Sequence, residues 1–523
     1  MSSSDYRAKC LNAINSKQKV WDLIVIGGGA TGLGIALDAT MRGLKTLLVE
    51  RADFAKGTSS RSTKLVHGGV RYLANGELKL VREASIERGY LKRNAAHLVK
   101  DQIFIIPVYS YFQVIKYTIG LKIYDWIAGR LSFGSSYFIS CKKTLAQLPG
   151  IKSKNLVGGV LYHDGQFDDA RLALNLAQTI WEKGGYAINY FTTTALLKDA
   201  YQKIFGIQAM DLETGLQYNI HAKSVVNATG VFADEILTLD NKIHKKILSV
   251  SQGIHLVLPA SFLPTTNALM IPETSDGRVL FAVPWHNKLI LGTTDTPIAK
   301  ADIEPKALEQ EIEFILETAT VHLTKKPTRA DVLSVFAGLR PLAAPQSIHQ
   351  KTKEISRGHK IIVSASGLIS VIGGKWTTYR KMAEDTVDTI EKQLEITHIK
   401  CTTTNLLIHG SSPNTDFSNP LYVYGADAEA LKKNIAADGN EMISEVLQIH
   451  KAQIVWAIEN EMARTLEDVL QRRTRALFLD AKESIRIAQP VAELMANILQ
   501  KDSNWIQNQV DDFNSIAKHY LLN

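Results

Sequence analysis

The sequence predicts an α/β protein with a Rossmann-like nucleotide-binding domain, a mixed-sheet second domain and an all-helical C-terminal domain. Three observations predict this fold class. A strand, a glycine-rich turn and a helix followed by a second strand fill residues 21–50, the order of a parallel crossover unit. Short apolar runs separated by turn residues fill 187–228 and 246–300, which is typical of strands. After a polar stretch at 409–420 the pattern is nearly all helical.

Length and composition set the outer bounds. A chain of 523 residues has room for two or three domains, and a composition of 45% hydrophobic and 21% charged residues allows large buried cores. This composition excludes a disordered chain, and 34 glycines, an ordinary number for this length, exclude a collagen-like one. The three cysteines, Cys10, Cys141 and Cys401, form no CxxC pair, so we expect no disulfide framework and no metal site.

The net charge and the search for targeting segments limit the kinds of partner and location that the sequence predicts. The excess of 60 Lys and Arg over 52 Asp and Glu gives a net charge of +8, which suits an anionic partner without choosing among a phosphate metabolite, a membrane surface and nucleic acid. The first twenty residues contain no apolar stretch typical of a secretory signal. Since no run of about 18 apolar residues occurs either, we expect no membrane-spanning helix.

Residues 27–32 match G-x-G-x-x-G between the strand at 23–26 and a helix at 33–41. In this motif Gly27 allows the tight turn, Gly29 lets a pyrophosphate approach the backbone, and Gly32 permits helix-strand packing. The next strand, 45–49, ends at Glu50, whose carboxylate can bind both hydroxyls of an adenosine ribose. These residues predict an ADP-containing cofactor.

The choice between NAD and FAD rests on the surrounding sequence. No second G-x-G-x-x-G is present for a nicotinamide cofactor, which favours one tightly held FAD. The segment 57–73 is rich in hydroxyl side chains and contains the pair Gly68-Gly69, so it can line a pyrophosphate and pass close to a planar ring.

Further elements follow from periodicity and turn residues. We expect helices at 78–99, 168–183, 305–324 and 375–394, a hairpin turn at 213–215, a buried strand at 224–227 and paired strands in IIVSASGLISVIGG. Residues 108–139 predict amphipathic helices; core packing is the simpler interpretation, and a face against a membrane surface is the alternative.

Several motifs carry a resemblance to a known family: TSSRSTKLVHGGVRYL, SVVNATG, LILGTTDTP, FAGLRPL and GGKWTTYRKMAE. Together they resemble the FAD-dependent glycerol-3-phosphate dehydrogenases within the D-amino-acid-oxidase-like flavoproteins. The similarity runs, with gaps, from about residue 20 to the C-terminus, and EMARTLEDVLQRRTR is similar to that family's helical extra domain. It implies oxidation of sn-glycerol 3-phosphate to dihydroxyacetone phosphate with hydride transfer to FAD.

This chemistry needs a base, cations for the phosphate and a substrate carbon held against the flavin. The resemblance implies that four cations converge on the phosphate: Arg71, Arg340, Arg357 and Lys375. Arg340 and Lys375 are also expected to act in catalysis, with Tyr72 as a neighbouring donor. His67 and His255 are the candidate bases; His255 alternatively binds the hydroxyl or the phosphate.

The residues expected to contact FAD are spread along the chain: Gly27, Gly29, Gly32, Glu50, Arg51, Thr58, Ser59, Ser62, Lys64, His67, Ala228, Gly374, Lys375 and Thr377. Residues 373–378 are predicted to open a helix whose amides face the flavin pyrimidine edge, where negative charge grows on reduction. Trp376 departs from the family pattern, in which we expect a smaller aliphatic residue, so its packing over the flavin is open.

The expected domains are an N-terminal extension at 1–19, a discontinuous FAD-binding domain at 20–74, 164–245 and 331–400, a substrate domain at 75–163 and 246–330, and a helical domain at 405–523. By resemblance, the absence of a long insertion typical of the oxygen-using oxidases favours quinone as the electron acceptor. We expect a cytoplasmic protein bound peripherally to the inner face of the cytoplasmic membrane, through 108–139 and the basic charge. The oligomeric state is open, with a homodimer as one option.

Three alternatives remain. Two are enzymes of the same superfamily: a glycerol-3-phosphate oxidase that uses oxygen, and an oxidase of amines or amino acids. The third is a flavin-carrying nucleic-acid-binding protein. The only basic cluster of the helical region, at 471–475, is short and lies beside Glu467 and Asp468, so we expect no nucleic-acid partner.

Overall fold

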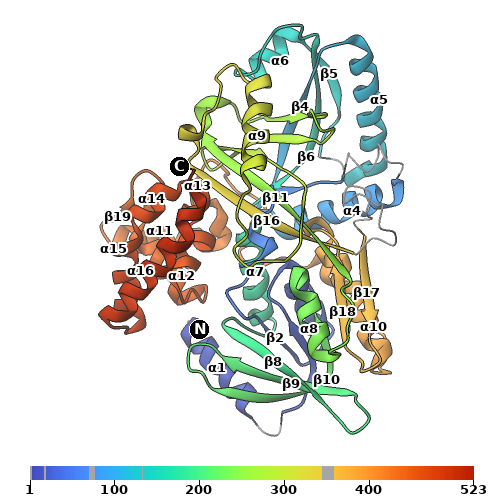
Figure 1. The fold of residues 1–523 in the computed structure, drawn as a ribbon, viewed down its shortest axis with the longest axis vertical. Coiled ribbons are helices and arrows are strands. Elements are labelled where there is room, and N and C mark those ends of the chain that lie inside the picture. Colours follow the sequence, from blue (N-terminus) through green and yellow to red (C-terminus); the bar gives the residue numbers. More distant parts are fainter. Residues whose placement is uncertain (1–2, 17–18, 70–76, 132, 344–357, 523) are drawn as a thin grey trace.

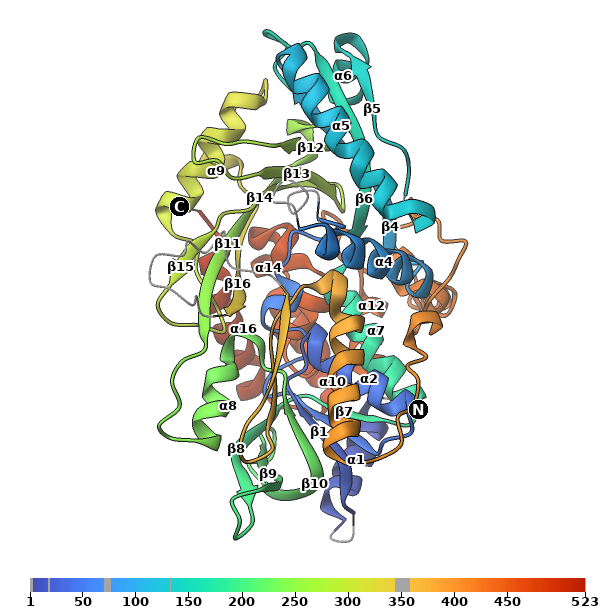
Figure 2. The ribbon, with the colours of Figure 1, turned by 90° about the vertical axis from the view of Figure 1, so that its right-hand side faces the viewer.

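The computed structural model describes residues 3–16, 19–69, 77–131, 133–343 and 358–522. Two β-sheets form the framework of the molecule, and a helical domain packs beside them (Figures 1 and 2). The predicted fold class is confirmed: the protein is α/β, with mixed sheets and a helical C-terminal domain.

The first sheet has the strand order β17-β18-β10-β1-β2-β7, with β8 and β9 joined to it through β10. Its strands are β1 (Trp21–Ile26), β2 (Thr46–Val49), β7 (Tyr186–Ile188), β8 (Phe191–Lys198), β9 (Ile204–Asp211), β10 (Gln217–Asn227), β17 (His359–Val363) and β18 (Ile369–Gly373). The central pairs β10–β1, β1–β2 and β2–β7 are parallel. Strands β1 and β2 are almost wholly buried and apolar, as central parallel strands are.

Helices α2 (Ala30–Met41), α7 (Asp169–Glu182) and α10 (Tyr379–Gln393) belong to this sheet, and α2 packs against both of the others. Helix α1 (Ser3–Asn15) forms the N-terminal extension. It is tied to the sheet by Tyr6, whose hydroxyl donates to Gly185 O (2.7 Å), and by an ion pair between Arg7 and Asp211 (2.6 Å).

The second sheet has the order β15-β11-β14-β13-β12-β4-β6-β3, with β16 paired to β11 and β5 to β6. Its strands are β3 (Leu65–Val66), β4 (Val99–Val108), β5 (Tyr137–Ser140), β6 (Gly158–Phe167), β11 (Leu248–Pro259), β12 (Ala268–Ile271), β13 (Leu280–Trp285), β14 (Lys288–Gly292), β15 (Thr296–Ile298) and β16 (Ser334–Ala343). The helices of this region are α4 (Leu78–Asn94), α5 (Tyr111–Ala128), α6 (Cys141–Gln147) and α9 (Glu309–His322).

The helical domain comprises α11 (Ala428–Ala437), α12 (Lys451–Asn460), α13 (Ala476–Leu479), α14 (Ala481–Arg486), α15 (Ala488–Leu499) and α16 (Ser503–Ala517), with a π-helical turn at Asp468–Arg473. It also holds a two-stranded hairpin, β19 (Met442–Ser444) with β20 (Ile449–His450), that the helical pattern did not predict. A separate hydrophobic cluster fills this domain and continues onto Phe336 of β16.

Three predicted boundaries differ from the structure. The helix expected at 78–99 ends at Asn94, because Val99 begins strand β4, which pairs with β6. Residues 108–139 form one helix, α5, and then strand β5. Strand β16, expected in the first domain, pairs along its length with β11 of the second sheet, and the chain returns to the first sheet only at β17.

Other predicted elements are confirmed. The hairpin at 213–215 joins β9 to β10, the paired strands are β17 and β18, and the helix at 305–324 corresponds to α9. In the part of the chain described here, none of the helices is both long and apolar enough to cross a lipid bilayer.

Candidate active site

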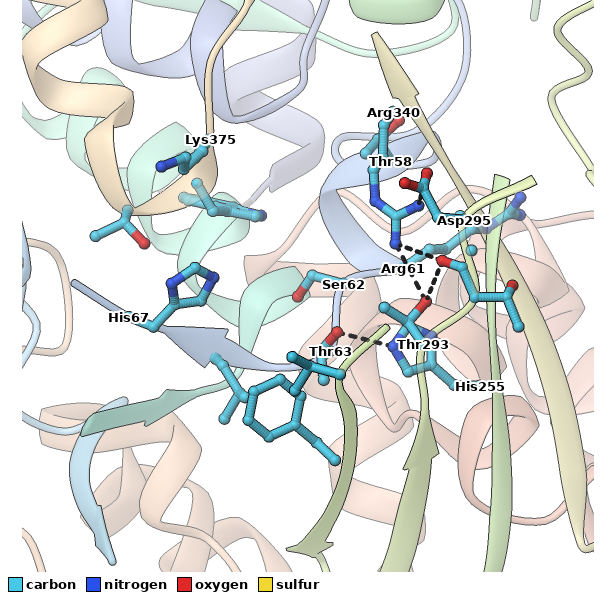
Figure 3. A pocket seen from close by; sticks show the side chains of 18 of the residues that line it. Thr58, Arg61, Ser62, Thr63, His67, His255, Thr293, Asp295, Arg340 and Lys375 are labelled. Atoms are coloured by element: carbon cyan, nitrogen blue, oxygen red, sulfur yellow. Dashed lines mark hydrogen bonds and ion pairs between the residues drawn. The ribbon is translucent and has the colours of Figure 1, made fainter. Parts of the chain in front are cut away.

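Two cavities lie where the first sheet meets the second. The nucleotide cavity, of about 370 Å³, is lined by Gly27, Gly29, Glu50 and segments 55–59 and 228–232 among others. The junction cavity, of about 280 Å³, is lined by residues of the loop 58–67 and of strands β11 and β16 among others (Figure 3). Both cavities are bounded by Thr58, Pro341 and residues 373–376, so they adjoin.

The glycine turn after β1 explains why glycine is needed in the fingerprint. Gly27 has a φ of +112°, and a Cβ there would lie 2.6 Å from Ala228 O. A Cβ on Gly32 would lie 1.8 Å from Gly27 O, so this glycine is required for close packing of α2 on the turn. The Ala30 N–H at the start of α2 donates to Ser59 Oγ (2.9 Å), which ties the turn to the loop after β2.

Glu50 lies directly after β2 and is partly buried. Its carboxylate accepts from the backbone N–H groups of Gly28 (2.5 Å) and Ala52 (2.8 Å). Burial raises the pKa of this carboxyl, opposed by the two N–H donors. Arg51 lies at the exposed rim, where its guanidinium pairs with Glu235 (2.9 Å) and covers the ring of Phe232.

The segment after Gly57 is held by contacts from other elements. Thr58 Oγ1 donates to Leu339 O of β16 (2.6 Å), and the indole N–H of Trp376 donates to Ser59 O (2.8 Å). The Trp376 ring also meets Phe167 and Tyr379 edge to face. Trp376 therefore packs between the loop and α10 and is hydrogen-bonded to the loop. This contact is a structural reason for tryptophan at a position where the family pattern has a smaller residue.

Arg340 stands on β16 at the wall of the junction cavity (Figure 3). Its guanidinium donates to Asp295 Oδ1 (3.2 Å), Thr293 Oγ1 (3.2 Å) and two backbone carbonyl oxygens. A Cβ on Gly253 would lie 2.3 Å from Arg340 Nη2, so glycine at this position makes room for the side chain. The guanidinium is therefore fixed in orientation before any anion arrives.

His255 lies deeper in the same wall, with only 2% of its surface exposed. Its ring stacks on Phe336, and its Nε2 lies 2.9 Å from Thr63 Oγ1. Burial, with smaller contributions from Lys64 and Arg340, holds the pKa of His255 well below its usual range. The imidazole is therefore neutral at physiological pH.

His67 follows the short strand β3 and is half-buried. In Figure 3 its ring lies on the same side of the junction cavity as Lys375, across from Arg340 and His255. The next residue anchors it, since the Gly68 N–H donates to Asp164 Oδ1 (3.3 Å). Asp164 is itself bonded by Arg88 (2.6 Å) and by the hydroxyl of Tyr124 (3.1 Å).

Lys375 lines both cavities, directly after two glycines in left-handed conformations. A Cβ on Gly374, where φ is +82°, would lie 2.3 Å from Met382 Sδ. The helix expected to open here begins later, at Tyr379, after one 3₁₀ turn at Trp376–Thr378. The backbone at 373–375 is thus a glycine-dependent turn, which carries the predicted residues Gly374 and Lys375 to the boundary between the cavities.

The remaining predicted residues divide into three groups. Ser62 and Thr377 line the junction cavity, and Ala228 lines the nucleotide cavity. The Lys64 ammonium is buried, donates to Ser60 O (2.6 Å) and Asp169 (2.7 Å), and lines neither cavity. The third group, Arg71, Tyr72 and Arg357, lies outside the described residues.

Sequence reasoning missed several polar side chains of the junction cavity. Thr293 and Asp295 directly follow β14, and Thr63 and Arg61 precede β3. All four lie within the quoted motifs LILGTTDTP and TSSRSTKLVHGGVRYL, so polar residues that directly follow or precede a predicted strand were a usable signal.

The two cavities fit an elongated dinucleotide such as FAD. The nucleotide cavity supplies a glycine turn that a Cβ would fill, a helix N-terminus and a partly buried carboxylate beside them. Residues 373–376 connect it to the junction cavity, which holds cationic and hydroxyl side chains. ADP recognition and substrate chemistry would therefore occupy neighbouring spaces.

Comparisons with known proteins agree with this geometry. Residues 22–380 match the model of the FAD dependent oxidoreductase family, and residues 368–505 match that of the C-terminal domain of alpha-glycerophosphate oxidase. The mitochondrial glycerol-3-phosphate dehydrogenase of Mesocricetus auratus is 39% identical over 92% of this chain and 70% of its own length. The enzyme of that name from Homo sapiens is 38% identical over 94% and 72%.

A solved structure is similar over nearly the whole chain. The glycerol-3-phosphate dehydrogenase from Bacillus halodurans complexed with FAD is 32% identical, with a TM-score of 0.80 over 99% of this chain and 98% of that one. The L-alpha-glycerophosphate oxidase from Mycoplasma pneumoniae, at 16% identity and a TM-score of 0.56, shares the fold.

Replacement of the Glu50 carboxylate tests the nucleotide cavity. Glu50→Gln puts an amide donor beside the N–H groups of Gly28 and Ala52, so we expect the purified protein to lose most of its FAD, as measured by the flavin-to-protein absorbance ratio. Glu429→Gln, at an exposed glutamate of α11 paired with Lys432, is the control and should retain FAD. Full FAD content in Glu50→Gln would remove Glu50 from the cofactor site.

Proposed function

The chain belongs to the family of FAD-dependent glycerol-3-phosphate dehydrogenases, and we propose that it oxidises sn-glycerol 3-phosphate to dihydroxyacetone phosphate and passes the electrons to a quinone. The observation that carries the proposal is the junction cavity, where Arg340, Lys375 and two histidines surround a space adjoining the nucleotide cavity.

Phosphate binding is assigned to the cationic side of the junction cavity. Arg340 presents a guanidinium oriented by Thr293 and Asp295, and a planar fork of donors suits a phosphate dianion. Lys375 adds a point charge at the boundary between the cavities. These two cations, with Arg71 and Arg357 expected from the family resemblance alone, favour phosphate over the single carboxylate of an amino acid.

We assign to His67 the role of the base that accepts the proton of the substrate hydroxyl. FAD, when bound, supplies the hydride acceptor for the substrate carbon. His67 is half-buried at the cavity, and the contact from Gly68 to Asp164 fixes its backbone. His255 is the weaker base, because burial holds its pKa well below its usual range. Its ring is also stacked on Phe336, and its Nε2 is hydrogen-bonded to the Thr63 hydroxyl. Its proposed role is to orient the Thr63 hydroxyl.

The quinone part of the proposal rests on helix α5. Tyr111, Phe112 and Trp126 are 77%, 74% and 82% exposed on this helix, and Ile115, Ile119 and Ile123 continue the same apolar stripe. The same part of the molecule carries exposed lysines, Lys116 and Lys122 on α5 and Lys142 and Lys143 on α6. Helices α5 and α6 and strand β5 form the end of the molecule far from the first sheet (Figures 1 and 2).

An apolar stripe of this size facing water is unfavourable, whereas at a lipid interface its side chains are buried and the lysines meet anionic headgroups. We infer that this α5 face docks on an anionic bilayer. An acceptor dissolved in the bilayer, such as a quinone, is then within reach of the protein, which favours the dehydrogenase over the oxygen-using oxidase.

Arg340→Ala tests the phosphate assignment. The loss of a charge-assisted contact should raise KM for glycerol 3-phosphate by roughly 10- to 100-fold while FAD stays bound. The measurement is anaerobic bleaching of the flavin absorbance as a function of substrate concentration. Arg329→Ala, an exposed arginine paired with Glu309, is the control. An unchanged KM removes Arg340 from the site, and bleaching by a small amine but not by glycerol 3-phosphate would overturn the proposed substrate.

His67→Asn tests the proton assignment. Loss of a general base slows the chemical step by roughly 10²- to 10⁴-fold, so flavin reduction in stopped-flow measurements should fall far more than substrate affinity. His255→Asn is the comparison and should cause the smaller effect on the reduction rate. The opposite ranking of the two variants would transfer the role of base to His255.

The α5 face is tested by cosedimentation with vesicles of phosphatidylcholine and phosphatidylglycerol. The wild type should bind, and Phe112→Glu with Trp126→Glu should not, because two carboxylates would enter the lipid interface. Tyr201→Glu, at an equally exposed aromatic residue on the β8–β9 turn, is the control. Vesicles that contain a quinone should reoxidise the reduced protein; reoxidation by oxygen at the same rate would favour the oxidase.

A further inference from the structure

The loop between β2 and β3 lines both cavities, and its outer side faces the helical domain. Residues 50–51 and 55–59 of this loop border the nucleotide cavity, and Arg61 borders the junction cavity. On its inner side the Ala55 N–H donates to Gly28 O (3.0 Å), and Ser59 Oγ accepts from Ala30. The conformation of this cofactor loop, residues 50–61, is therefore coupled to that of the glycine turn.

Two arginines of the helical domain bind the cofactor loop at Asp53. Arg472 Nε lies 2.6 Å from Asp53 Oδ2, and Arg473 Nη2 lies 3.0 Å from Asp53 Oδ1. All three side chains are fully buried, and the pairs span about 420 residues of sequence. The arginines belong to the π-helical turn at 468–473, and Arg473 also donates to Glu461 O (2.6 Å).

A second contact is made at Lys56. Its ammonium pairs with Glu467 of the helical domain and with Glu304, which follows β15 of the second sheet. Glu304 also accepts from Arg61 (2.7 Å), and Glu467 from Arg472 (2.6 Å). One continuous set of charges thus joins the helical domain, the cofactor loop and the second sheet.

Charges buried at a domain interface contribute little to adhesion, because their desolvation offsets most of the attraction. An apolar surface would hold the domains together at least as well. What the charged contacts add is a defined geometry, since each carboxylate and guanidinium must meet its partner in one orientation. Because these contacts are made to the loop that borders the nucleotide cavity, they fix the conformation of the cavity wall.

We propose that the helical domain is a positioning element for FAD, in which Arg472, Arg473 and Glu467 hold residues 50–61 in the conformation that closes around the cofactor. The proposal concerns retention of FAD and not the substrate, so its outcome is independent of the electron acceptor and of the base. Arg472, Arg473 and Glu467 line neither cavity and act through Asp53 and Lys56.

The test compares two glutamates of the helical domain. Glu467→Gln removes the charge that faces Lys56, and Glu483→Gln removes the partner of Arg486 and Ser444, contacts that do not touch the cofactor loop. Holoenzyme is diluted, and release of FAD is followed by the gain in free-flavin fluorescence at a temperature where circular dichroism shows both variants folded. We expect release about tenfold faster in Glu467→Gln, the scale of one lost hydrogen bond to a charged group.

Glu483→Gln is the control for a purely structural role. Its carboxylate is 9% exposed, so this variant should lose about as much Tm as Glu467→Gln, whose carboxylate is 14% exposed, yet release FAD at the wild-type rate. Should Glu467→Gln fail to fold, Glu467→Asp replaces it, because the shorter side chain keeps the charge but withdraws the carboxylate from Lys56. FAD release at the wild-type rate in the tested variant, or equal acceleration in Glu483→Gln, would overturn the proposal.

Discussion

The position of the cofactor loop, residues 50–61, is the constraint on which both cavities depend. Its inner side is hydrogen-bonded to the glycine turn, its end to β16 through Thr58, and its outer side to the helical domain through Asp53. A displacement of this one segment would open the wall of the nucleotide cavity and remove Arg61 from the junction cavity. The geometry of both cavities therefore depends on the two sheets and on the helical domain, because all three are bonded to this loop.

Local signals in the sequence predicted the parts of the site that backbone geometry determines. Gly27 and Gly32 are glycines because a Cβ would collide with a neighbouring backbone, and the hairpin turn at 213–215 depends on residues adjacent in the sequence. The long-range contacts were out of reach of such signals. Nothing near Lys64 indicates that its ammonium pairs with Asp169, and nothing near β16 indicates that it joins β11. Those pairings arise from packing between segments far apart in sequence.

The two candidate bases show why motif context alone could not separate them. Both histidines border the junction cavity, and both lie near glycines in the sequence. The difference is solvation: His255 is stacked on Phe336 and faces two cations, which disfavours its protonated form, whereas His67 keeps partial access to the cavity. Burial of a side chain depends on the packed fold, so no local pattern reports it.

In the proposed function, the charge distribution would allow one protein to bind a phosphate at one site and an anionic membrane at another. Cations at the junction cavity are fixed by partners, as Arg340 is by Asp295 and Arg61 by Glu304, so they present a small oriented site to a small anion. The lysines beside α5 are exposed on a surface that also carries Tyr111 and Trp126. A diffuse set of charges around apolar side chains suits a fluid layer of headgroups, because neither partner needs a fixed geometry. In the proposed function, the fixed cations of the junction cavity and the exposed lysines of α5 and α6 would therefore recognise two kinds of anion with different rigidity.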